Sequence, residues 1–235
     1  MSLALVEAMR DQKPIPVTLF STANVPPKTD ALSLSKMNVI DGYTLGKALS
    51  EIVWHVAAHE TGFPLLIARP VGVYGPRDTF AEDGNVIPAL MVKCMKARMA
   101  TLVPAKKVIP SPSGKARAAA VVDRPTVKAA SFEVWGTGNE ERAFLYVEDL
   151  VTALLKLRDS DATGVQYISS GEVITIRELA EQIRNLVAPG QAIKFLRERQ
   201  LGPRTMPLLP PHPALRTISW TPFVKGLKKT YESWK

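Results

Sequence analysis

The sequence has one cysteine, three histidines and no long apolar run. Cys94 alone cannot form an internal disulfide or a cysteine-based metal site, which suits a reducing compartment. No apolar run reaches the roughly 18 residues that a membrane span requires. The N-terminus also lacks a basic segment followed by an apolar run and a cleavage site. We therefore expect a soluble, unexported, cytoplasmic protein that does not enter a membrane.

The few histidines argue against a metal site. His55 and His59 have helical spacing, but "HVAAH" lacks a glutamate after the first histidine, and His212 lies in the proline-rich "LPPHPAL". Solvent-facing histidines are the simpler interpretation, and we expect no bound metal.

Most of the net charge of +8 lies in one segment, residues 101–131. Six basic residues stand there against Asp123 alone, which gives five of the eight charges. The segment is rich in alanine, proline and serine and has no sustained period, so it predicts a mobile insertion or lid. It could attract a phosphorylated ligand or RNA. Because it holds no aromatic side chain to stack on bases, nucleic-acid binding is the weaker alternative.

The order of the predicted elements indicates an α/β fold. A short apolar run at 16–20, an amphipathic helix over 43–60 that stops at Gly62, and the continuous apolar run 63–70 form one βαβ unit. A run without alternation is typical of a parallel strand that is buried on both faces. Further strands are expected at 132–136, 143–147, 164–170 and 192–196, and further helices at 3–12, 85–97, 148–159, 175–187 and 223–234.

The helix 43–60 begins with Tyr43 and Lys47, four residues apart. Both side chains therefore leave the same face of the helix, and a cation close to a phenol favours the phenolate. The spacing alone fits two interpretations. One is an acid–base pair, and the other is a half-buried tyrosine beside a surface lysine.

Seven segments in order resemble one family. They are "STANV", "YTLGK", "ARPVGVYGPRDTF", "NVIPAL", "VWGTGNEERAFLYVEDL", "ISSGEVITIRELAEQI" and "SWTPFVKGLKKTYESW". Together they resemble the extended short-chain dehydrogenase/reductases, and within them the nucleotide-sugar epimerases and dehydratases of the GDP-L-fucose synthase and GDP-mannose epimerase type. The resemblance implies the latter half of a Rossmann-type parallel sheet with a smaller α/β substrate-binding lobe. It assigns 1–75 and a strand near 164–170 to the dinucleotide-binding domain, and 76–163 and 171–235 to the lobe.

The resemblance implies catalytic roles at three positions. Tyr43 corresponds to the acid/base that exchanges a proton with a sugar hydroxyl, and Lys47 to the cation that favours its phenolate and holds the cofactor ribose. Thr22, in "STANV", corresponds to the hydroxyl that orients the substrate oxygen. For Thr22 the alternative is an ST-turn that ends the strand.

The resemblance also implies binding residues. Arg142 matches an arginine that contacts the sugar-nucleotide diphosphate, Trp135 a nucleotide-side contact, Lys93 a basic residue on the substrate helix, and Asn85 a residue of the substrate loop. A core tryptophan and solvated lysine and arginine side chains are the alternatives.

The implied cofactor is NAD or NADP. Pro70 and Val73 fall where the family's chain passes the nicotinamide. The family's G-x-x-G-x-x-G turn, which binds the cofactor pyrophosphate, does not occur in the 235 residues. The resemblance thus implies a sheet without its first strands, completed by a homodimer or a partner chain.

Smaller departures concern single positions. Gly46, Pro26 and Gly72 replace residues that are common in the family, and Asn24 and Asn85 stand where fucose-synthase-type epimerisation uses a cysteine and a histidine. An asparagine cannot shuttle a proton near neutral pH. The leading hypothesis is an NAD(P)-dependent nucleotide-sugar epimerase/dehydratase, or a truncated form of one. The alternative is an inactive remnant that acts as a sugar-nucleotide-binding or scaffold subunit.

Overall fold

The structure is a computed structural model that describes residues 2–9, 13–26, 42–102, 131–199 and 210–234. By contacts the chain divides into two compact units. The first holds the described residues of Met1–Arg77, Glu140–Thr175 and Gly202–Lys235, and the second those of Asp78–Asn139 and Ile176–Leu201. Most of the predicted basic insertion, 103–130, lies outside the described residues, and the sequence-based lobe boundaries stay a prediction. None of the described helices is both long and apolar enough to cross a membrane.

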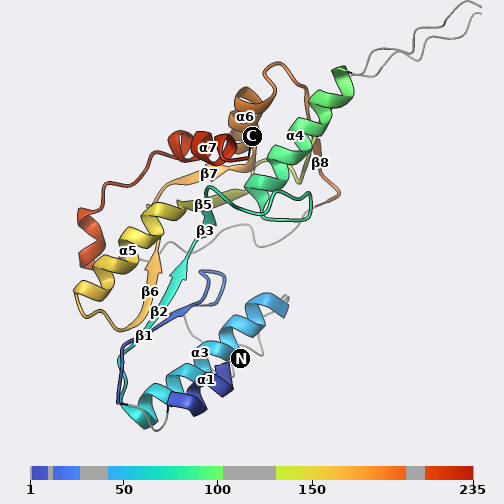
Figure 1. Cartoon of the computed structure of the whole chain (residues 1–235). Helices are drawn as coiled ribbons and strands as arrows, with labels where there is room; N and C mark the ends of the chain where they lie inside the picture. The colour runs from blue at the N-terminus through green and yellow to red at the C-terminus, as the bar shows by residue number, and fades with distance from the viewer. Residues whose placement is uncertain (1, 10–12, 27–41, 103–130, 200–209, 235) are drawn as a thin grey trace, which may run out of the picture. The chain divides into compact units, whose positions relative to one another are not determined.

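A parallel sheet forms the centre of the first unit. Its strands are β1 (Val17–Phe20), β2 (Leu65–Pro70) and β6 (Gly164–Ile168), in the order β1-β2-β6 (Figure 1). Every residue of β2 is buried. The apolar run without alternation therefore formed the central strand of a sheet covered on both faces, as the sequence predicts.

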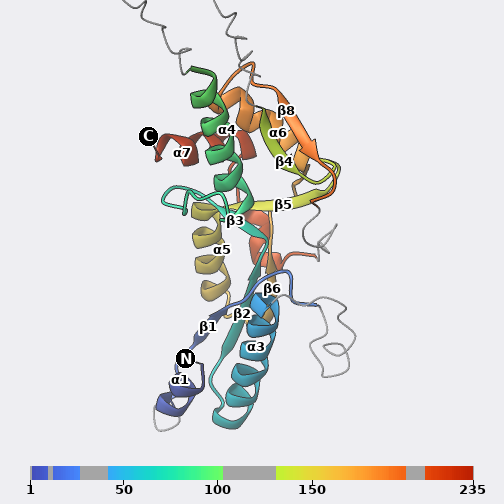
Figure 2. The same cartoon turned by 90° about the vertical axis from the view of Figure 1, so that its right-hand side faces the viewer.

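Helices cover both faces of β2. Leu65 and Ile67 pack with Trp54 and Ala57 of α3 (Gly42–Thr61), and Val6 of α1 (Ser2–Met9) joins the same cluster. Figures 1 and 2 both show α1 beside α3.

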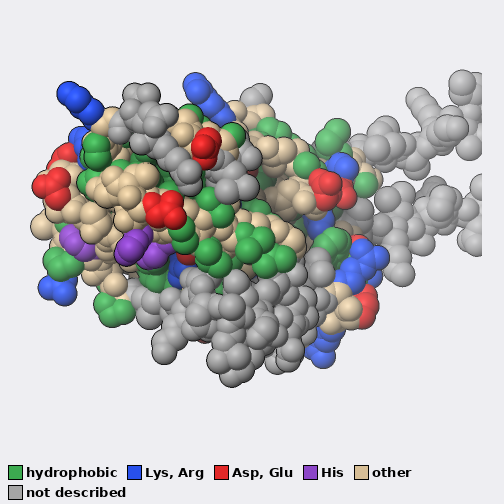
Figure 3. All heavy atoms as spheres, turned by 90° about the horizontal axis from the view of Figure 1, so that it is seen from below, with side chains coloured by type: hydrophobic (Ala, Val, Ile, Leu, Met, Phe, Trp, Pro, Cys, Tyr) green, Lys and Arg blue, Asp and Glu red, His purple; other side chains and the backbone are tan. Residues whose placement is uncertain are grey.

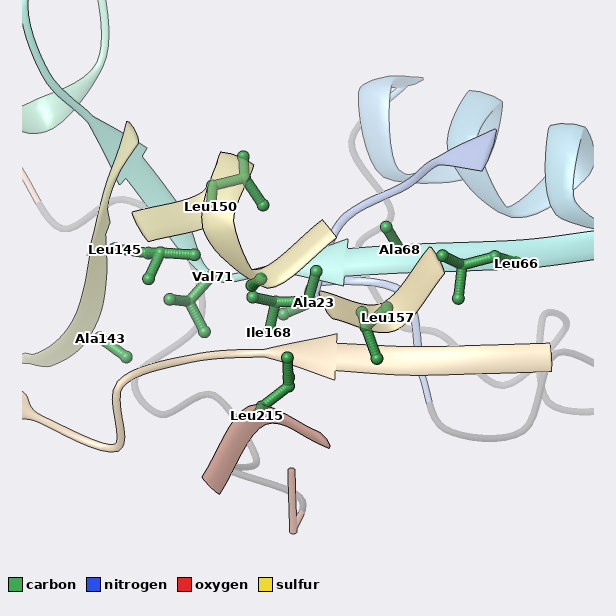
Figure 4. Packing of buried hydrophobic residues seen from close by; sticks show 11 residues of the cluster. Ala23, Leu66, Ala68, Val71, Ala143, Leu145, Leu150, Leu157, Ile168 and Leu215 are labelled. Atoms are coloured by element: carbon green, nitrogen blue, oxygen red, sulfur yellow. The ribbon is translucent and has the colours of Figure 1, made fainter. Parts of the chain in front are cut away.

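The opposite face of β2 packs against another helix. Leu66 and Ala68 belong to one buried cluster with Leu150, Ala153 and Leu157 of α5 (Val147–Asp159). Figure 4 shows how side chains from α5, β2, β6 and the 3-10 helix η1 (Pro213–Thr217) converge in this cluster. Successive side chains of β2 point to opposite faces of the sheet, so they belong to two separate hydrophobic clusters.

A second sheet of the first unit contributes residues to an aromatic cluster. Strand β3 (Gly72–Tyr74) pairs parallel with β5 (Glu141–Tyr146), which pairs antiparallel with β7 (Val173–Thr175). The Tyr74 ring lies 5.2 Å from that of Phe223, the first residue of α7 (Phe223–Glu232), and 5.7 Å from that of Tyr146. Burial raises the pKa of Tyr74, whose hydroxyl donates to the carbonyl of Phe223 at 3.2 Å.

The second unit combines two helices with a two-stranded sheet. Helix α4 (Val86–Leu102) packs on α6 (Ile176–Val187), and β4 (Phe132–Trp135) pairs parallel with β8 (Ile193–Leu196) (Figure 2). The burial of β4 alternates, with Phe132 and Val134 buried and Glu133 and Trp135 exposed. This alternation presents Trp135 to solvent on the outer face of the strand.

Most predicted elements are confirmed, with shifted ends. The helix predicted over 43–60 spans Gly42–Thr61 and ends at Gly62, whose φ is 77°. Strands β3 and β7 were not predicted, because three residues are too few to show a period. His212, predicted to face solvent, instead is half-buried and caps η1, where its Nδ1 accepts from the amide of Ala214 at 3.2 Å.

Candidate active site

The structure brings Tyr43 and Lys47 together at the start of α3. The ammonium nitrogen of Lys47 lies 5.7 Å from the centre of the Tyr43 ring, which is within the range of a cation–π contact. The same nitrogen donates a 2.8 Å hydrogen bond to the carbonyl of Phe20, the last residue of β1. The pair therefore lies at the carboxyl end of β1, where open parallel sheets bind ligands.

The exposures of the pair leave both interpretations open. Tyr43 is 59% exposed, and Lys47 is half-buried. The tyrosine is thus more exposed and the lysine more buried than the structural interpretation assumes, but a cation beside an exposed phenol is also an ordinary surface feature. The phenol is accessible to a ligand, and the ammonium beneath it is held by the sheet.

Thr22 follows β1 in the same region. It is 9% exposed, and its Oγ1 accepts from the amide of Asn24 at 3.3 Å, so the ST-turn is present. A hydroxyl that accepts one hydrogen bond keeps its own proton for a second partner. The turn therefore fixes the hydroxyl without removing its capacity to donate.

Pro70 and Val73 lie where β2 ends and β3 begins. Pro70 is buried, and its carbonyl accepts from the amide of Ala23 at 3.0 Å. The side chain of Val73 is half-buried and packs on the core cluster of Leu145 and Ile168. A backbone hydrogen bond thus links the segment after β1 to the last residue of β2. The predicted cofactor residues lie at the same edge of the sheet as Lys47.

In the second unit, Lys93 and Trp135 lie in contact. The ammonium of Lys93 is 4.0 Å from the centre of the Trp135 ring, and the guanidinium carbon of Arg199 is 5.5 Å from it. Trp135 is 37% exposed, so it is not a core tryptophan. Partial burial, assisted by Arg199, lowers the pKa of Lys93 against the opposing effect of Glu82 and Glu133. The result is an exposed aromatic face flanked by two cations.

Arg142 and Asn85 belong to different units. Arg142 is half-buried on β5 in the first unit, and burial lowers its pKa, partly offset by Glu140. Asn85 is exposed in the second unit, where its carbonyl accepts from the amide of Ala89 in the first turn of α4 and its side-chain amide donates to Asp78 at 3.4 Å. Asn85 therefore precedes α4 as an N-cap residue does.

Three residues of these regions were not singled out from the sequence. Arg199 completes the cationic surround of Trp135, and Glu51 forms a buried ion pair with Arg69 beneath α3. Glu51 continues the spacing of Tyr43 and Lys47 by one further turn, which is the one signal that could have drawn attention to it.

The described residues contain no group of three or more side chains suited to hold a metal ion. His55 and His59 are exposed one turn apart on α3, and Figure 3 shows histidine side chains at the surface of the molecule. Two imidazoles alone do not complete the four-coordinate set that a structural zinc requires.

The comparisons define the family. Residues 1–169 match the NAD dependent epimerase/dehydratase family. The chain belongs to this family, as the seven sequence segments imply. It is 28% identical over 226 residues to GDP-L-fucose synthase 1 of Arabidopsis thaliana, with 94% of this chain and 57% of that protein covered. It is 29% identical over 177 residues to probable GDP-L-fucose synthase 1 of Oryza sativa subsp. japonica, with 73% and 45% covered.

Solved structures show the same fold. A GDP-L-fucose synthetase from Naegleria fowleri bound to NADP superposes with a TM-score of 0.67 at 17% identity, and covers 99% of this chain and 70% of that chain. The chain is therefore an α/β protein of the Rossmann type found in these epimerases. It spans about half the length of the curated relatives it matches.

Proposed function

We propose that the chain carries the proton-handling and sugar-nucleotide-binding residues of an NAD(P)-dependent nucleotide-sugar epimerase/dehydratase, whole or as a truncated form. The observation that carries the proposal is the Tyr43–Lys47 pair at the carboxyl end of β1, with an exposed phenol and a cation anchored to Phe20. Family membership supports the same reaction class.

In the proposed mechanism Tyr43 exchanges a proton with a sugar hydroxyl. The Lys47 ammonium stabilises the phenolate form by its positive charge. The hydroxyl of Thr22 donates to the reacting sugar oxygen and so holds it within hydrogen-bond reach of the phenol. When bound, the nicotinamide supplies or accepts the hydride at the sugar carbon.

A nicotinamide dinucleotide fits the part of the site that this chain supplies. Lys47 lies at the carboxyl edge of a parallel sheet, and Pro70 and Val73 join that edge through the bond between Ala23 and Pro70. Lys47 would hold the ribose, and the chain at Pro70 and Val73 would lie beside the nicotinamide. The 235 residues contain no G-x-x-G-x-x-G turn to hold the pyrophosphate.

The second unit supplies some of the proposed nucleotide contacts. The exposed Trp135 ring offers a face on which a base can stack, and the Lys93 and Arg199 cations can neutralise phosphate oxygens. Arg142, a planar guanidinium on β5, is proposed to contact the diphosphate, and Asn85 the sugar. A homodimer or a completing partner chain stays a prediction.

Calorimetry on the 235-residue chain tests the proposal. NAD, NADP, GDP-sugars and UDP-sugars are titrated into the parent chain, Lys47→Ala and the control Lys228→Ala, which removes an exposed lysine of α7. The proposal predicts that Lys47→Ala weakens dinucleotide binding by about tenfold or more, as expected for a lost charge-assisted hydrogen bond. The control should bind like the parent.

Two other results would favour different functions, and a third would contradict the role of Lys47. Sugar nucleotides that bind while dinucleotides do not would favour the inactive remnant, which keeps only the substrate side. Binding of RNA without any affinity for sugar nucleotides would favour a basic RNA-associated protein. Equal dinucleotide binding by the parent and Lys47→Ala would contradict the role of the lysine.

A further inference from the structure

A buried ion pair lies one turn beyond Lys47 on α3. Glu51 is 3% exposed and Arg69, on β2, is fully buried. The Nε of Arg69 donates to Oε1 of Glu51 at 2.9 Å, and its Nη2 donates to Oε2, so the pair is bidentate. Tyr43, Lys47 and Glu51 share one stripe of the helix, which passes from solvent at Tyr43 to the core at Glu51.

A third nitrogen of Arg69 reaches the turn that carries Thr22. Its Nη1 donates to the carbonyl of Pro26 at 2.9 Å and to that of Val25 at 3.4 Å, and it also bonds the hydroxyl of Tyr167 on β6 at 2.6 Å. One guanidinium thus joins α3, the 21–26 turn, β2 and β6. Burial acts to lower the pKa of Arg69, but Glu51 and Tyr167 more than offset this, so the pKa is raised and the charge persists.

Glu51 also contacts the turn directly. The hydroxyl of Ser21 donates to Oε1 of Glu51. The backbone amides of Ser21 and Ala23 also donate hydrogen bonds to the carbonyls of Ala68 and Pro70, at 2.8 and 3.0 Å. Thr22 therefore lies between two anchored residues, and one of them is tied by its side chain to the helix of Tyr43 and Lys47.

A buried ion pair adds little net stability, because the loss of hydration opposes the attraction, and an apolar pair of similar volume often serves as well. Broken on one side, it leaves an unpaired buried charge. The hydrogen bonds of Arg69 also fix how α3 and the strand β2 are oriented, since a bidentate guanidinium–carboxylate pair has one preferred geometry. Apolar side chains would suffice to pack α3 on the sheet, so the bidentate ion pair calls for a further explanation.

We propose that Glu51 and Arg69 are positioning residues, which hold the Thr22 turn and the helix of Tyr43 and Lys47 in one fixed arrangement. The inference rests on the proposed function for its consequence, since the arrangement is useful only if these three side chains act on one ligand. The positions themselves can be tested without a ligand.

The first test uses the double variant Glu51→Leu/Arg69→Met in the full 235-residue chain. Removal of both charges avoids an unpaired buried charge, but Ser21, Tyr167 and the carbonyls of Val25 and Pro26 lose these partners, so thermal stability should fall less than in either single variant. The amide of Asn24, which donates to Thr22, should exchange hydrogen about tenfold faster or more, because its turn has lost a tether. The amide of Ala153 in α5 should show a clearly smaller increase. Unchanged exchange at Asn24 in a stable double variant would overturn the proposal.

The second test uses Ser21→Ala, which removes one hydroxyl and keeps the ion pair. We expect faster exchange at Asn24 and weaker dinucleotide binding, each by about tenfold. Ser160→Ala is the matched control, because it removes a hydroxyl that donates to Leu157 at 2.9 Å at the end of α5. Exchange at Asn24 that matches the parent in Ser21→Ala would overturn the proposal, and this variant decides if the double variant does not fold.

The two hypotheses fail separately. If the parent chain binds no dinucleotide, the proposed function fails while the exchange measurements still decide the positioning claim. If the parent binds and both variants bind equally well with unchanged exchange, the positioning claim fails alone.

Discussion

A single helical stripe gives three polar residues three different environments. Tyr43 is 59% exposed, Lys47 is half-buried with its ammonium on the carbonyl of Phe20, and Glu51 is 3% exposed and bonded to Arg69. Each step of four residues is slightly more than one turn, so the row drifts around the helix toward the buried face that also holds Thr44 and Ala48. Identical spacing therefore places an accessible acid/base candidate, its cation and a buried anchor in one row.

Cys94 provides a prediction at the residue scale. The thiol is fully buried in α4, and burial raises its pKa from 9.0 to about 11. At pH 8 we expect the native chain to react with a thiol reagent roughly a hundredfold more slowly than the chain unfolded in urea, because thiolate is scarce and access is blocked. Equal rates would contradict the buried position.

The same shift has a consequence for stability at alkaline pH. Because the folded pKa of Cys94 lies above the unfolded value of 9.0, its contribution is fully present below pH 9 and is lost as the pH rises through about 11. Urea unfolding at pH 8 and pH 10.5 should show a smaller alkaline loss of stability for Cys94→Ala than for the parent.

At the scale of elements, α7 is fitted against the second sheet of the first unit. Gly226 allows this approach, because a Cβ there would fall against the hydroxyl of Tyr74 and 3.0 Å from Cδ2 of Tyr146. Tyr74 cannot move aside easily, since it is 3% exposed and its ring is enclosed by aromatic neighbours. The helix and the aromatic cluster therefore constrain one another.

Two glycine substitutions test this fit. Gly226→Ala should lower the free energy of unfolding by ~1–3 kcal/mol, because the added methyl overpacks the cluster. Gly46→Ala is the matched control in α3, where a Cβ meets nothing within 4 Å. It should raise the free energy of unfolding by ~0.4–1 kcal/mol, since alanine restricts the unfolded chain. Urea unfolding measures both, and a neutral Gly226→Ala would contradict the packing described.

At the scale of the whole molecule, how far sequence predicts structure depends on the length of each pattern. The run 63–70 predicted β2 because it is a continuous apolar segment of strand length, and 43–60 predicted α3 because its helical period repeats over several turns. Tyr43 and Lys47 could be paired from sequence because their contact is local. Glu51 and Arg69, 18 residues apart, could not, because an acidic residue on a helix and an arginine in "IARP" show no sign of meeting until the sheet forms.

The chain spans about half the length of its curated relatives, so its place in a complete enzyme is a proposal. The apolar side chains of Leu45, Leu49 and Val56 are exposed on α3. Among the described strands, β1 pairs only with β2. An exposed apolar face and an edge strand are features that a partner could cover, and the homodimer or completing partner chain stays a prediction.

The most direct measurement of the central claim is the oxidation of NADPH, followed at 340 nm, when the chain is mixed with a nucleotide sugar that carries a keto group. The account predicts that the parent chain reduces the sugar, and that Tyr43→Phe is slower by ~10²–10⁴-fold because the proton donor is lost while the ring remains. Tyr43→Phe that turns over at the parent rate would contradict it, whereas a parent chain that leaves NADPH unchanged would favour the inactive remnant.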